Sequence, residues 1–126
     1  MAEVIDWDEA MQQCGDDEEF LRELLGDLRE ETDSQMAKME EIIRNPTNSP
    51  FIAIVRAAHV IKGAASNLMC GQLRATAMAL ETAAQSAAST PNGMSDPAVL
   101  QPVQSRFQDL KTAVANYHAY LASVGV

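Results

Sequence analysis

Apolar residues recur at steps of three and four along one long stretch of the chain, and this periodicity constrains the fold more than any other feature. Such steps place side chains on one face of an α-helix, here a stripe about 27 residues long. The stripe consists of Leu21, Leu25, Leu28, Thr32, Met36, Met39 and Ile43. Few segments alternate between apolar and polar residues, as half-buried strands do. The sequence therefore predicts an all-α chain.

Capping residues, glycines and prolines predict the limits of five helices. Asp6 and Glu9 form a capping-box pattern before a short first helix, which Gly15 ends. Pro102 cannot lie comfortably inside a straight helix, so a kink or a restart is expected there. The other four helices are predicted to begin at Asp16 or Asp17, at Ser49-Pro50, at Gly71 or Gln72, and at Asp96-Pro97 or Gln101-Pro102.

Each of the last three helices has its own apolar stripe. The predicted inward residues are Phe51, Ile54, Ala58, Ile61, Ala65 and Leu68, then Leu73, Ala77, Leu80, Ala84 and Ala87, then Val103, Phe107, Leu110, Val114, Tyr117 and Leu121. Loops are expected over residues 45–50 and 89–97. Four long helices with short connections predict an up-down-up-down four-helix bundle with a short extra N-terminal helix. Residues 1–126 are expected to form a single domain. Because the apolar stripes are all expected to be buried within one bundle, a monomer is favoured.

The third helix carries a polar group on the face opposite its apolar stripe. At roughly 100° per residue, Lys62 lies about 60° from His59, while Ser66 lies only about 20° away. Gly63 lies about 40° from His59 on the other side. It lowers helix stability by about 1 kcal/mol relative to alanine, and it leaves room beside the imidazole. A neutral imidazole can act as a nucleophile, and an ammonium can hold the oxygens of a captured anion, which suits a phosphoryl group.

The stretch from His59 to Gly71 resembles the active-site helix of histidine-containing phosphotransfer domains. The family pattern is His-x-x-Lys-Gly followed by small residues, a turn and a leucine. The residues that match in place are His59, Lys62, Gly63, Ala64, Ala65 and Leu73, and Leu80-Glu81 is similar to a Leu-Glu pair on the family's next helix. The family usually has glycine ten residues after the histidine, where this chain has Met69. With Gly71 two residues later, the shape of the turn stays open.

The resemblance implies a phosphorelay carrier without ATP chemistry of its own, and hence not an enzyme. A receiver domain carrying a phospho-aspartate would dock over the third helix, and His59 would attack the phosphorus. Lys62 would neutralise the phosphoryl oxygens, Gly63 would admit the receiver, and Ser66 would hydrogen-bond at the edge. The implied partners are receiver domains of hybrid histidine kinases and response regulators. They would supply Mg²⁺, and no cofactor is implied for this chain.

Docking residues are expected beside His59, and a second function stays open. Val55 and Arg56 precede His59 on the third helix, while Phe20 and Leu24 flank the stripe of the second helix. Phe20 and Leu24 either help to form an apolar docking surface or pack in the core. The alternative function is a helical protein-interaction module that binds a partner through the same face without phosphoryl chemistry.

Charge and composition narrow the function classes. The net charge is −9. Residues 1–45 hold 15 Asp or Glu and 4 Lys or Arg, a balance of −11, and the remaining residues hold 3 and 5, a balance of +2. This pattern argues against nucleic acid and anionic membrane surfaces as partners. The acidic residues of the second helix are expected to form a solvated face.

The sequence has no stretch of 18 apolar residues, and its acidic N-terminus is unlike a signal peptide. Cys14 and Cys70 lack CxxC spacing, which fits a reducing compartment. A cytoplasmic location is expected, and also a nuclear one if the source is eukaryotic. Neither His59 nor His118 has a glutamate three residues before it, as a di-iron bundle would need. No nucleotide-binding motif is present, and His118 is expected to be structural or solvated.

Overall fold

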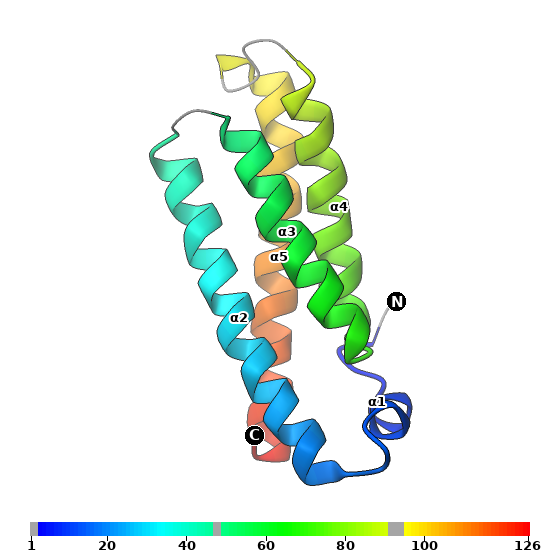
Figure 1. The fold of residues 1–126 in the computed structure, drawn as a ribbon. Helices are drawn as coiled ribbons and strands as arrows, with labels where there is room; N and C mark the ends of the chain where they lie inside the picture. The colour runs from blue at the N-terminus through cyan, green and yellow to red at the C-terminus, as the bar shows by residue number, and fades with distance from the viewer. Residues whose placement is uncertain (1–2, 47–48, 91–94) are drawn as a thin grey trace.

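The computed structural model describes residues 3–46, 49–90 and 95–126, and these residues contain five α-helices. Their bounds are α1 Trp7–Gln13, α2 Glu18–Arg44, α3 Pro50–Asn67, α4 Gly71–Ala88 and α5 Pro97–Val124. The four long helices run alternately up and down side by side, and α1 lies at one end of the bundle (Figure 1). The predicted all-α, up-down-up-down four-helix bundle with a short N-terminal helix is confirmed.

The core is formed by one stripe from each long helix. α3 packs against α2 and α4, and α5 closes the ring by packing against α4 and α2. Every residue predicted to face inwards on α3 and α4 is buried. On α2, however, Gln35 is buried while the predicted Met36 and Ile43 are only half-buried. The buried positions continue in strict heptad steps there, and the Gln35 amide is satisfied by donating to Glu31 Oε1 at 3.2 Å. On α5, Ala113 is buried and Val114 is half-buried.

Carboxylates cap three of the helices. Asp6 accepts from the Glu9 amide at 3.1 Å, Asp17 from the Phe20 amide at 3.0 Å, and Asp96 from the Ala98 amide at 3.0 Å. Asp17, rather than Asp16, is thus the N-cap of α2. The predicted start of α3 at Ser49-Pro50 is confirmed, with Ser49 as the N-cap residue and Pro50 as the first helical residue, but the Ser49 side chain makes no capping hydrogen bond. Ser49 has φ 55°, whereas a capping side chain normally extends from an extended backbone.

α5 begins at Pro97 and continues through Pro102 without interruption. Of the two predicted starts, the one at Asp96-Pro97 is therefore confirmed, and the restart at Gln101-Pro102 is wrong. Pro102 removes one backbone hydrogen bond near the start of the helix. The first turn is still held, because Val99 and Leu100 pack against the core. Residues 47–48 and 91–94 of the two predicted loops lie outside the described residues.

The turn between α3 and α4 keeps a regular form although Met69 stands where the family usually has glycine. The Cys70 amide donates to the Ala65 carbonyl at 2.9 Å and the Met69 amide to the Ser66 carbonyl at 3.4 Å, which is a Schellman motif. The motif needs a left-handed residue between Leu68 and Cys70, and Met69 takes this conformation with φ 58°. The turn thus keeps the form that glycine usually gives it. It determines where α4 begins and which of its residues face α3.

Candidate functional site

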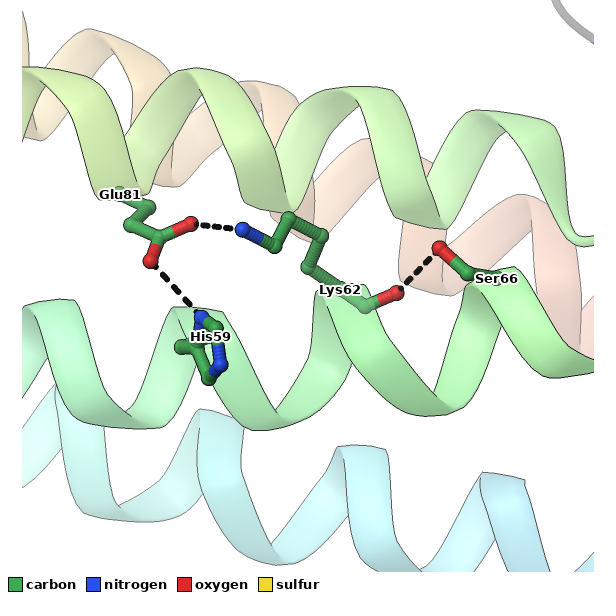
Figure 2. A network of polar contacts seen from close by, with 4 residues as sticks. All are labelled: His59, Lys62, Ser66 and Glu81. Atoms are coloured by element: carbon green, nitrogen blue, oxygen red, sulfur yellow. Dashed lines mark hydrogen bonds and ion pairs between the residues drawn. The ribbon is translucent and has the colours of Figure 1, made fainter.

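The four predicted site residues lie on the outer part of α3. The His59 side chain is 65% exposed, and Gly63 is exposed one turn further along. A Cβ atom added at Gly63 would have no neighbour within 4 Å, so the space beside the imidazole is open. Lys62 and Ser66 are half-buried on the side that faces α4. Figure 2 shows this arrangement.

A carboxylate from α4 joins two of these residues. Glu81 lies between His59 and Lys62, with Oε2 3.0 Å from His59 Nδ1 and Oε1 2.7 Å from Lys62 Nζ (Figure 2). The Glu81 side chain is only 10% exposed. One buried carboxylate therefore holds both an imidazole and an ammonium in place.

Electrostatics decide the protonation of this group. Burial by itself raises the pKa of the Glu81 carboxyl, but the hydrogen bonds and charges of Lys62 and His59 outweigh it and leave the pKa below its ordinary value. Glu81 is thus ionised at neutral pH and can only accept hydrogen bonds. Because it faces Nδ1, that nitrogen carries the proton, and Nε2 of the neutral ring keeps its lone pair. Nε2 points away from Glu81 (Figure 2).

Lys62 and Ser66 differ in the hydrogen-bond donors that their side chains can still provide to a bound anion. An ammonium has three N–H donors, and Lys62 uses one on Glu81, so further donors remain for an anion near His59. The Ser66 hydroxyl donates to the Lys62 carbonyl at 2.9 Å, one turn back along its own helix. Its hydrogen is therefore engaged in this conformation, and the role suggested for Ser66 stays a prediction.

Glu81 is the residue whose contribution the sequence did not reveal. In the sequence it stands out only as part of the Leu80-Glu81 pair. Two features of its position indicate a special role. Glu81 is the only Asp or Glu in the sequence between Glu41 and Asp96, and it follows Ala77 by one turn on the buried side of α4. A carboxylate at such a position requires hydrogen-bonding or cationic partners. His59 and Lys62 provide them.

Two open grooves lie between α2 and α3, and they contain three of the four candidate docking residues. The first, termed the acidic groove, is lined by Phe20, Leu24, Leu28 and Ala64 together with Asp27 and Glu31. The second, termed the basic groove, is lined by Ile42, Ala53, Ala57 and Val60 together with Lys38 and Arg56.

The candidate docking residues thus occupy different places. Phe20 is 47% exposed and lies outside the core, whereas Leu24 is half-buried, packs against the core and also lines the acidic groove. Arg56 lines the basic groove. Val55 is half-buried, packs against the core and lines neither groove.

The remaining reactive side chains have simpler surroundings. His118 Nε2 lies 2.8 Å from Asp33 Oδ1, and both side chains are exposed to solvent. Burial raises the pKa of the Cys70 thiol to about 12, so it stays protonated at neutral pH.

Among residues 3–46, 49–90 and 95–126, no three His, Cys, Asp or Glu side chains gather in a way that could hold a metal ion. Within the same ranges, no helix has the length and apolar composition needed to cross a membrane.

Comparison with protein families identifies the class of protein. The profile of the Hpt domain matches residues 23–119, from the second turn of α2 to the last turns of α5. The chain belongs to the Hpt domain family, whose members carry phosphoryl groups on histidine in phosphorelays and interact with receiver domains. A search of curated proteins and a search of solved structures each found no match.

Proposed function

We propose that this chain accepts a phosphoryl group on His59 from the phospho-aspartate of one receiver domain and passes it to the receiver of a response regulator. One observation carries the assignment to His59. The buried, ionised Glu81 accepts from Nδ1 of an exposed imidazole and also holds Lys62 beside it. The arrangement supports Nε2 as the nucleophile and Lys62 as the cation that meets the phosphoryl oxygens.

The transfer step balances without an added base. The Nε2 lone pair attacks the phosphorus of the acyl phosphate, forming the N–P bond while the P–O bond to aspartate breaks. The aspartate leaves as a carboxylate. His59 keeps the proton on Nδ1, so the phosphorylated ring carries a positive charge next to Glu81. Attack by the aspartate of a second receiver reverses the step and restores the neutral ring.

Lys62 and Gly63 have complementary parts in this proposal. The charge of Lys62 acts most strongly when the docked receiver excludes water and the phosphoryl group lies between donor and acceptor. Gly63 supports the approach because nothing occupies the space where its side chain would begin. The Mg²⁺ ion and the aspartate belong to the receiver, and this chain supplies the histidine, the lysine and the carboxylate that positions them.

Incubation with phosphorylated receiver domains from the source organism tests the proposal. The expected product is this chain carrying phosphate that is labile in acid and stable in base, as a phosphohistidine is. His59→Gln is the matched negative variant. Receivers that bind the chain but transfer no phosphate would contradict the proposal and favour the interaction module.

A further inference from the structure

The acidic and basic grooves lie on opposite sides of the proposed phosphorylation site along α3. Ala64, which follows Gly63, lines the acidic groove, and Val60, which follows His59, lines the basic groove. Both grooves have exposed apolar side chains, Phe20 in the first and Val60 in the second, at 47% and 39% exposure. A receiver centred over His59 would therefore contact both.

The acidic groove is lined by two carboxylates, those of Asp27 and Glu31. Neither Asp27 nor Glu31 forms an ion pair within the described part of the chain. Glu31 accepts from the neutral amide of Gln35, at 3.2 Å. The groove therefore fits an apolar side chain with a lysine or arginine beside it.

The basic groove has the opposite balance. Its cations are Lys38 and Arg56, and the residues that the structure describes provide an ion-pair partner for neither. Glu41 also lines this groove, but its carboxylate lies 3.8 Å from Arg44 and accepts from the Asn45 amide at 2.8 Å. The groove therefore fits a partner surface that carries Asp or Glu.

We infer that this charge difference sets the orientation in which a receiver domain docks. The inference rests on the proposed function, which requires the receiver aspartate to face His59. A receiver with Lys or Arg opposite Asp27 and Glu31, and with Asp or Glu opposite Lys38 and Arg56, meets complementary charge at both ends. If the same receiver is rotated so that its two ends exchange places, it meets like charge in both grooves. Such complementarity acts mainly on association rate and on the choice of partner.

The test uses charge reversals with matched controls. Glu31→Lys is compared with Glu30→Lys, an exposed neighbour on α2 that lines neither groove. Arg56→Glu is compared with Arg106→Glu, an exposed residue on α5 outside both grooves. For each protein, the second-order rate constant of transfer is measured with the receiver that phosphorylates the wild type fastest. It is divided by the rate with phosphoramidate, a small donor that needs no docking and reports the reactivity of His59.

At about 50 mM NaCl, the two groove variants are expected to lower this ratio about tenfold, within the range known for electrostatic steering. The loss should shrink in about 500 mM NaCl, and the two controls should stay within about twofold of the wild type. If the controls fall as far as the groove variants, or if no variant changes the ratio, the orientation proposal is overturned while the proposed function stands. If no receiver phosphorylates the chain, the proposed function fails and this inference fails with it.

Discussion

Two histidine–carboxylate pairs occur in this bundle, and they have different surroundings. His59 on α3 faces Glu81 on α4 at 3.0 Å, and His118 on α5 faces Asp33 on α2 at 2.8 Å. The shorter contact belongs to the pair outside the candidate site. What differs is the carboxylate, since the side chain of Glu81 is 10% exposed and that of Asp33 is 50% exposed. Glu81 also binds Lys62.

A histidine–carboxylate contact is therefore not by itself a functional site. Around an exposed pair, water screens the charges, and such pairs contribute little. A buried carboxylate has little water to bind, so it depends on its protein partners and holds them in place. The engaged ring nitrogen differs too. Glu81 binds Nδ1 and leaves Nε2 of an exposed ring available, whereas Asp33 occupies Nε2 of His118.

The largest expected effect comes from removing each histidine in turn. His59→Gln is expected to abolish phosphate acceptance while the protein stays folded, because the ring is mostly exposed and its loss leaves no cavity. His118→Gln is expected to accept phosphate at the wild-type rate. Phosphate labelling together with circular dichroism on both variants checks this. Loss of cooperative unfolding in His59→Gln would instead give the ring a structural role.

Removing the lysine should have the next largest effect. Lys62→Ala is expected to slow transfer about 10²–10³-fold, the loss typical when one preorganised charged contact to a transition state is removed. The transfer rate of Lys62→Arg should lie between those of wild type and Lys62→Ala, because guanidinium spreads its charge over a larger planar group. Single-turnover rates from a phosphorylated receiver provide the measurement. The matched control is Lys111→Ala, whose lysine forms an exposed ion pair with Glu40 at 3.7 Å. Equal rates for all four proteins would remove Lys62 from the chemistry.

Neutralising each of the two carboxylates, Glu81 and Asp33, tests whether burial of the carboxylate matters for transfer. Glu81→Gln keeps an acceptor for Nδ1 but loses the charge, and a charge-assisted hydrogen bond is about twice as strong as a neutral one. Transfer is expected to fall roughly tenfold, since about 1.4 kcal/mol separates the two kinds of bond. Asp33→Asn should change transfer by less than about twofold, as expected for an exposed pair. Equal losses in both variants would mean that burial of the carboxylate does not matter.

Glu81→Gln also tests a pH dependence of stability. The pKa of Glu81 is lower in the folded protein than its ordinary value, because Lys62 and His59 outweigh the effect of burial. Its stabilising contribution is therefore complete above the unfolded-state pKa, about 4.3, and disappears as the pH falls through the lower folded-state value. Urea unfolding should thus show wild type more stable than Glu81→Gln at pH 7, with the gap closing below about pH 4. A gap that widens on acidification would contradict this sign.

The smallest effect is expected at the turn that positions α4. Met69→Gly should stabilise the fold by about 0.5–1 kcal/mol, because a left-handed non-glycine residue costs about 1–2 kcal/mol and glycine loses part of this to backbone entropy. Transfer should be unchanged, since Met69 already takes the left-handed conformation that glycine would take there. Met69→Ala is the control that keeps the strained backbone. If Met69→Gly is no more stable than Met69→Ala, the left-handed backbone carries no strain. If it is more stable than Met69→Ala but less stable than wild type, packing of the half-buried Met69 side chain outweighs the strain.

The bundle could be predicted because its determinants are local and repeated. Apolar steps of three and four mark the buried faces of α3 and α4, and carboxylates such as Asp6 and Asp17 mark helix starts. Where prediction failed, another force decided the outcome. Core packing of Val99 and Leu100 holds the turn before Pro102, and the left-handed backbone of Ser49 leaves this N-cap residue without a side-chain capping hydrogen bond.

The site could be predicted only along a single helix. Spacing on α3 is enough to group His59, Lys62 and Gly63 on adjacent faces. The contact with Glu81 depends on how α4 packs against α3, which no local pattern in α3 encodes. The two grooves likewise depend on the register between α2 and α3, and for that reason Asp27 and Glu31 looked like ordinary solvated charges in the sequence.

We propose that Glu81 holds the proton on Nδ1 of His59 and leaves Nε2 to take the phosphoryl group. Nitrogen-15 NMR of the histidine side chains, before and after phosphorylation by a receiver, tests this directly. We expect two-bond couplings that place the phosphate on Nε2 of His59, with Nδ1 still protonated and the His118 signals unchanged. Phosphate on Nδ1 of His59, or on His118, would contradict the account.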